Sequence, residues 1–104
     1  MLDLNERYKT MLIGIIKFSF TVPVEVWAYG SRVNGGSHDA SDLDLVIRSV
    51  DTKPIDLKMM RNFIERLKNS NIPILVEARD WALLPESFHK QILKNHEPLF
   101  PEKQ

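Results

Sequence analysis

The stretch from residue 29 to residue 45 constrains the fold more than any other part of the sequence. It places a break of small residues between two strand-like segments. The segment Val24–Tyr29 before the break is rich in β-branched and aromatic residues, a composition that predicts a strand. Residues 43–48 after it contain a Leu-Val-Ile run, which predicts a second strand buried on both faces. We therefore expect a small sheet organised around these two strands.

The first strand leads directly into Gly30 and Ser31. A glycine can make the sharp turn out of a strand, and a serine is a favoured residue at a helix start. The free amides of a helix start attract anions such as phosphate. The same pair could also be an ordinary turn and helix cap, a common feature of any domain.

Two aspartates, Asp42 and Asp44, open the second strand. Residues two apart in a strand point to the same face, with Cα atoms about 6.5–7 Å apart. Neighbouring carboxylates repel each other unless a cation lies between them. A phosphate-binding turn facing such a pair indicates a magnesium–nucleotide site. The alternative is a solvated strand end that carries two surface aspartates.

The overall composition limits the possible classes of function. The 104 residues fit one domain, residues 1–104. The 14 basic and 14 acidic residues cancel, which argues against direct nucleic-acid binding. Without cysteine there is neither a disulfide framework nor a cysteine-based zinc site. The start of the chain does not resemble a signal peptide, and the apolar run of residues 11–16 is too short to span a bilayer. We therefore expect a cytoplasmic protein without membrane contact.

The remaining segments complete an αβαβαβα order. The apolar spacing predicts helices over residues 3–18 and from residue 54 or 56 to 69, the latter with Asp56 as its N-cap. A third strand is expected over residues 72–79, a last helix over 83–95 and an irregular tail over 97–104. This pattern predicts an α/β (α+β) fold with a small mixed sheet and helices packed on one face. The carboxylates would lie on the other face, open to ligand.

The motif as a whole resembles a known family. Gly30-Ser31, ten further residues and Asp42-x-Asp44 resemble the signature of the DNA polymerase β nucleotidyltransferase superfamily. The full run, Gly-Ser-Arg-x-x-Gly-x5-Ser-Asp-x-Asp-Leu, is similar to its smallest branch, the minimal nucleotidyltransferases (MNT). Residues 74–81 resemble the third strand of that branch, so the resemblance extends over about residues 24–99. It implies a polymerase β-like nucleotidyltransferase fold.

The resemblance also implies roles for particular residues. Asp42 and Asp44 would bind one or two Mg²⁺ ions. Glu77 aligns with the third metal ligand, which is usually Asp in relatives; it could instead be a surface residue. Gly30 and Ser31 would hold the phosphates of a nucleoside triphosphate, with ATP expected.

Two further positions have both a binding and a structural interpretation. Arg32 could pair with phosphate or be a solvated helix residue, and Ser41 could orient the carboxylates or cap a turn. The following loop lacks the Lys that many relatives carry. Strand parity places Asp80 on the face opposite Glu77, which favours a structural role for Asp80. Trp27 and Trp81 are expected in the core or at an interface.

The implied activity is Mg²⁺-dependent transfer of a nucleoside monophosphate, AMP, from a nucleoside triphosphate to a hydroxyl. MNT proteins typically pair with a small helical HEPN-domain protein, often as the antitoxin to its RNase toxin, and some transfer AMP to a tyrosine of that partner. One alternative is a weak or inactive binding module that neutralises its partner by contact. A drug- or tRNA-modifying transferase is a weaker alternative, because those enzymes carry further domains.

Overall fold

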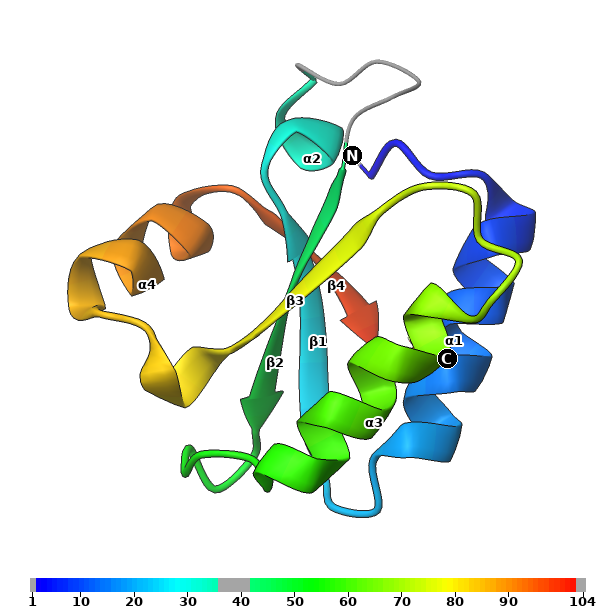
Figure 1. The fold of residues 1–104 in the computed structure, drawn as a ribbon. Helices are drawn as coiled ribbons and strands as arrows, with labels where there is room; N and C mark the ends of the chain where they lie inside the picture. The colour runs from blue at the N-terminus through cyan, green and yellow to red at the C-terminus, as the bar shows by residue number, and fades with distance from the viewer. Residues whose placement is uncertain (1, 36–41, 103–104) are drawn as a thin grey trace.

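The computed structural model describes residues 2–35 and 42–102 and shows a sheet with helices on both faces (Figure 1). The helices are α1 (Glu6–Ser19), α2 (Ser31–Asn34), α3 (Leu57–Lys68), α4 (Glu86–Lys94) and the 3-10 helix η1 (Trp81–Leu83). The strands are β1 (Val24–Tyr29), β2 (Leu43–Ser49), β3 (Val76–Asp80) and β4 (His96–Phe100). None of the helices in these parts of the chain has both the length and the apolar character that a membrane crossing requires.

The four strands form one mixed sheet in the order β3-β2-β1-β4. β1 pairs antiparallel with β2 and with β4, whereas β2 pairs parallel with β3. A parallel pair needs a long crossover connection, and α3 lies within the connection between β2 and β3. The predicted α/β class with a small mixed sheet is confirmed.

Helices α1 and α3 cover one face of the sheet (Figure 1). Alternate residues of β2 face these helices, and the core includes Leu12, Ile16, Leu43, Leu45, Ile47 and Phe63, all almost fully buried. α3 begins as predicted, because the Asp56 carboxylate accepts a hydrogen bond from the amide of Lys58 at 2.7 Å. α1 begins later than predicted, at Glu6, because the Asn5 side chain accepts from the amide of Arg7 and caps it.

The second face of the sheet is partly covered, which corrects the expectation that helices pack on one face alone. Tyr29, Val46 and Ile92 form a buried cluster there, and Phe88 and Trp81 pack against it. The reason lies in α4, whose apolar residues need a partner, and in Val46, whose side chain points away from α1 and α3. Only the part of this face away from α4 is left for the carboxylates.

The C-terminal segment contains a strand, so the predicted irregular tail over residues 97–104 is wrong for residues 97–100. β4 pairs with β1, and its residue Leu99 is 2% exposed. Pro98 lowered the strand signal in the sequence, but a proline is tolerated in an edge strand. The predicted order αβαβαβα therefore gains a fourth strand at its end.

The third strand is shorter than predicted and begins at Val76. It ends at Asp80, which is buried as strand parity suggested. The Asp80 carboxylate accepts hydrogen bonds from the amides of Ile55 at 2.8 Å and Ala82 at 3.0 Å. The predicted structural role of Asp80 is confirmed: it joins the start of η1 to the segment before α3.

Candidate functional site

Asp44 lies at the centre of the candidate site. In the sheet it is paired with Tyr29 of β1 on one side and with Glu77 of β3 on the other. Residues directly opposite each other in neighbouring strands carry their side chains on the same face, so the three form a row across the sheet. Asp42 lies two residues before Asp44 and close enough for its charge to act on it. The structure thus brings the three predicted carboxylates to one face.

The carboxylates of this row act on each other electrostatically. Burial raises the pKa of Asp44, and the negative charges of Glu77 and Asp42 raise it further. The guanidinium of Arg79 offsets part of the effect. The charged form of Asp44 is therefore disfavoured without a cation, which is the condition expected of a carboxylate group that binds a metal.

Gly30 lies directly against Asp44. Its φ is 83° and its ψ is −157°, a conformation that is essentially restricted to glycine. A Cβ atom added at this position would lie 2.6 Å from the Oδ2 atom of Asp44. The turn at the end of β1 and the carboxylates at the start of β2 therefore form one site, and this proximity requires a glycine.

Ser31 begins helix α2 immediately after Gly30 and is half-buried. The amide of Val33 bonds to the carbonyl of Gly30 at 3.0 Å, whereas the first amides of a helix have no partner within the helix. Ser31 thus offers an amide and a hydroxyl directly after Gly30, the residue that lies against Asp44. Ser41, the other serine predicted for the site, lies outside the described residues.

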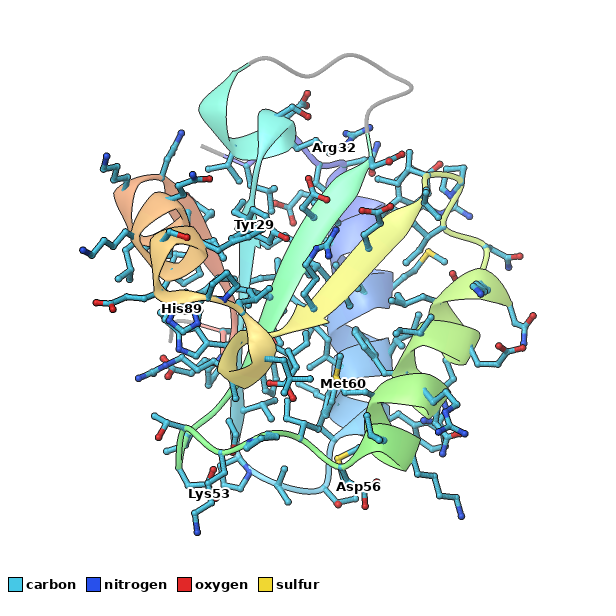
Figure 2. The ribbon with its side chains drawn as sticks, turned by 60° about the vertical axis from the view of Figure 1, so that its left-hand side comes forward. Tyr29, Arg32, Lys53, Asp56, Met60 and His89 are labelled. Atoms are coloured by element: carbon cyan, nitrogen blue, oxygen red, sulfur yellow. The ribbon has the colours of Figure 1, made fainter. Side chains whose placement is uncertain are left out.

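Arg32 is placed differently from the other predicted residues. It is 7% exposed, and its guanidinium donates to the carbonyl of Asp3 at 2.9 Å. The carbonyl of Arg32 in turn accepts from the amide of Asp3. Figure 2 shows Arg32 at the α2 end of the sheet. These contacts hold the N-terminal segment, so Arg32 is not a solvated helix residue; phosphate binding by Arg32 stays a prediction.

The sequence did not assign a role in the site to Tyr29 or Arg79. The Tyr29 hydroxyl is buried and makes no hydrogen bond of good geometry among the described residues. Burial and the charge of Asp44 raise the pKa of Tyr29, and Arg79 lowers it in part. The Nη2 atom of Arg79 also lies 3.8 Å from the Oε2 atom of Glu77. Strand parity alone puts Arg79 on the face of Glu77, but only the strand register brings Tyr29 beside Asp44.

Comparison with known proteins assigns the family. A family model described as polymerase beta, nucleotidyltransferase, matches residues 15–104. The chain belongs to this family. The Haemophilus influenzae protein named probable protein adenylyltransferase MntA is 39% identical over 69 residues, which are 66% of this chain and 59% of that protein. The matched segment is thus less than two thirds of the length of this relative. The family model and this relative together confirm the predicted resemblance to minimal nucleotidyltransferases.

Solved structures show the same fold. A crystal structure of a toxin–antitoxin with AMP-PNP has a TM-score of 0.74 at 16% identity and covers 92% of this chain and 75% of the other. A crystal structure of the toxin–antitoxin MntA–HepT has a TM-score of 0.69 at 11% identity and covers 94% of this chain and 74% of the other. The predicted polymerase β-like nucleotidyltransferase fold is therefore confirmed.

In this member of the family the carboxylates do not form a ready-made metal site. Within residues 2–35 and 42–102, no three His, Asp or Glu side chains converge closely enough to hold a metal as they stand. The donor set nevertheless fits Mg²⁺, which prefers carboxylate oxygens together with phosphate oxygens and water. The mutual repulsion that raises the pKa of Asp44 is also what a cation would relieve. Asp42, Asp44 and Glu77 are therefore the residues able to hold it.

Proposed function

We propose that the protein is a Mg²⁺-dependent nucleotidyltransferase that transfers AMP from ATP to a hydroxyl of a helical, HEPN-domain-like partner, as the antitoxin of a toxin–antitoxin pair. The observation that carries this proposal is the row of Asp44 and Glu77 across β2 and β3, with Gly30 packed against Asp44. Phosphoryl-group transfer depends mainly on positioning and on charge placed around the phosphates. This row places carboxylates and a helix start in one small region.

Gly30 and Ser31 would bind the phosphates that leave as pyrophosphate. Ser31 contributes its amide and its hydroxyl, and the bare Cα of Gly30 leaves room beside Asp44. The burial of Arg32 against Asp3 favours a positioning role, in which Arg32 fixes α2 and so the orientation of Ser31. A contribution of Ser41 to the same phosphates stays part of the proposal.

Asp42, Asp44 and Glu77 would hold Mg²⁺, one ion or two, which when bound neutralises phosphate charge and makes the attacking hydroxyl more acidic. Asp44 lies in β2, the strand that pairs with β1 next to Gly30, and Asp42 directly precedes this strand, so both serve the phosphate side of the site. Glu77 is one strand further away, so it serves the acceptor side. The buried ring of Tyr29 lies beside Asp44 and excludes water from that side of the row.

The reaction needs two coupled changes at the α-phosphorus. The acceptor hydroxyl oxygen forms a bond to this phosphorus, and the bond from the phosphorus to the bridging oxygen of the β-phosphate breaks. The electron pair of the broken bond leaves with pyrophosphate. The hydroxyl proton would pass to the Glu77 carboxylate, which lies beside Asp44 on the next strand.

The choice of ATP and of a protein partner is supported by the relatives. The similar Haemophilus influenzae protein bears the name of a protein adenylyltransferase. One solved structure of the same fold is a toxin–antitoxin with AMP-PNP, which is an analogue of ATP. Another is the toxin–antitoxin MntA–HepT.

One observation favours the alternative of an inactive binding module. Glu77 lies within 3.8 Å of Arg79, and no metal-binding group of three side chains is formed among the described residues. If this ion pair persists when nucleotide binds, Glu77 is unavailable, and the protein would act on its partner by contact alone.

Intact mass measurement separates the two functions. The protein is purified with its natural partner from the native host and incubated with ATP and Mg²⁺. We expect the partner to gain the mass of one AMP, and EDTA to prevent the gain. A stable complex that gains no mass under these conditions would support the binding module instead.

A further inference from the structure

The outer edge of β3 is open and lies beside the proposed acceptor side of the site. Among residues 2–35 and 42–102, β3 is the last strand of the sheet, with β2 on one side only (Figure 2, β3 in yellow). The amide of Leu43 bonds to the carbonyl of Leu75 at 2.9 Å. Since backbone groups alternate along a strand, those of Glu77 face β2 and those of Val76 and Ala78 face outward. The edge thus presents donors and acceptors to a further strand.

The surface along this edge suits an extended peptide. A groove of about 290 Å³ lies there and is lined by residues of β3 together with Ile64 and Lys68 of α3. Leu75 at its start is 54% exposed and offers an apolar contact to a bound segment. Lys68 and Arg79 add positive charge on either side of β3. The groove therefore favours a segment with alternating apolar residues and an acidic residue.

We propose that the acceptor segment of the partner adds to the edge of β3 as a fifth strand and presents its hydroxyl next to Glu77. This inference rests on the proposed transfer activity and specifies how the acceptor is bound. An added strand places the residue opposite Glu77 with its side chain on the same face, about 4.5–5.5 Å away between Cβ atoms. Backbone pairing would then set the position of the hydroxyl without a separate acceptor pocket.

The strand spacing also selects the acceptor side chain. An added strand would lie about 4.8 Å from β3 and so about 10 Å from β2, which carries Asp44. Side chains of a strand stand roughly perpendicular to the sheet. A serine or threonine hydroxyl stays close to the added strand, whereas the longer side chain of tyrosine can carry its hydroxyl further toward the carboxylates. The occupant is therefore an extended segment with a tyrosine opposite Glu77 and an acidic residue opposite Arg79.

An antiparallel arrangement predicts which peptide amides matter, and antiparallel pairs are the slightly more stable kind. The residues on either side of the tyrosine would exchange hydrogen bonds with Val76 and Ala78, whereas the amide of the tyrosine itself would point away. The probe is the blocked peptide Glu-Val-Tyr-Val-Thr. Methylation of the amide nitrogen of each valine blocks the pairing, and methylation of the tyrosine nitrogen is the matched control.

The test measures transfer of labelled AMP from ATP to these peptides at millimolar concentration, with MgATP binding measured in parallel by calorimetry. We expect the unmethylated and tyrosine-methylated peptides to be labelled at rates within about twofold. The valine-methylated peptides should be labelled at least about tenfold more slowly, as the loss of one or two hydrogen bonds implies. A peptide with serine in place of the tyrosine should remain unlabelled.

A protein variant gives a second test. Ala78→Pro removes the outward amide while leaving the bonds from β3 to β2, and prolines are tolerated in edge strands. It should bind MgATP normally and label the peptide about tenfold more slowly, whereas Ala78→Ser, which keeps the amide, should behave as the wild type. Equal labelling of all methylated peptides, or labelling of the natural partner without any labelling of the peptides, would overturn the edge proposal. Failure to label the natural partner as well would instead overturn the proposed function.

Discussion

Gly30 is the residue whose geometry most constrains the site. Its backbone conformation is nearly closed to other residues, and the space for a side chain is occupied by Asp44. Gly30→Ala should destabilise the protein by about 1–3 kcal/mol, because strain at such a position is of this size. It should also weaken MgATP binding, because either the turn or Asp44 must move. Urea denaturation and calorimetry measure the two effects.

Gly14 supplies the control for this substitution. It lies exposed within α1, and a Cβ there would meet no atom of residues 2–35 or 42–102 within 4 Å. Gly14→Ala should stabilise the protein by about 0.5–1 kcal/mol, the usual preference for alanine over glycine in a helix. If both substitutions have the same small effect, the close packing of Gly30 on Asp44 does not constrain the fold.

Glu77 is expected to act on the rate of transfer more than on nucleotide affinity. It is one strand further from Gly30 than Asp44 is, on the acceptor side of the site. Glu77→Ala should spare MgATP affinity and slow single-turnover transfer to the natural partner by about 10²-fold or more, as for other preorganised charged groups. Glu77→Asp, which restores the ligand usual in relatives, should keep activity. Transfer by the alanine variant at the wild-type rate would make Glu77 a surface residue.

Asp44 gives a prediction for pH in the absence of metal. Burial, Glu77 and Asp42 raise the pKa of Asp44 in the folded protein above its value of about 3.9 in the unfolded chain. The contribution of Asp44 to the free energy of unfolding is therefore most favourable below about pH 3.9, and it is lost as the pH rises through the folded-state pKa. Asp44→Asn should therefore become more stable relative to wild type across this pH range. Because the group is partly solvent-exposed, the gain should stay below about 1 kcal/mol. Thermal melts in EDTA from pH 3 to pH 8 test this; a difference independent of pH would contradict it.

At the scale of elements, the strands nearest the motif could be predicted and the outer ones could not. β1 agrees with its predicted bounds and β2 extends one residue further, because their buried apolar residues dominate the pattern. β4 was missed because His96, Glu97 and Pro98 weaken the signal, while its pairing with β1 is a long-range contact. The alternation of side chains along a strand predicted, from the sequence alone, the face of its own strand on which Asp42, Asp44 and Glu77 each lie. The position of Tyr29 beside Asp44 required the register between strands, which no local pattern contains.

Asp80 links several elements, which makes its loss costly. Its carboxylate accepts from the amides of Ile55 before α3 and Ala82 in η1. Asp80→Ala should destabilise the protein by about 2–4 kcal/mol, because it leaves the buried Ile55 amide without its partner. Asp56→Ala, which removes only the exposed cap of α3, should cost about 1 kcal/mol. Equal unfolding free energies for the two variants would contradict the linking role of Asp80.

At the scale of the whole molecule, ligand binding should be visible as added stability. The site draws on α2, β1, β2 and β3, so a ligand that binds there joins parts distant in sequence. A ligand that binds only the folded state at 100 times its dissociation constant contributes about 2.7 kcal/mol. For a domain of this size, that corresponds to a rise in melting temperature of about 10–20 °C. We expect MgATP to produce such a rise.

The double variant Asp42→Asn with Asp44→Asn tests where that stabilisation arises. The two side chains are at a partly exposed end of β2, so the variant should fold, and without ligand it should be at least as stable as wild type because their repulsion is removed. It should lose the rise in melting temperature with MgATP. ATP with EDTA on the wild type is the matched control and should give little rise. A metal-dependent rise of wild-type size in the double variant would place the metal elsewhere and remove the basis for assigning these two aspartates to the site.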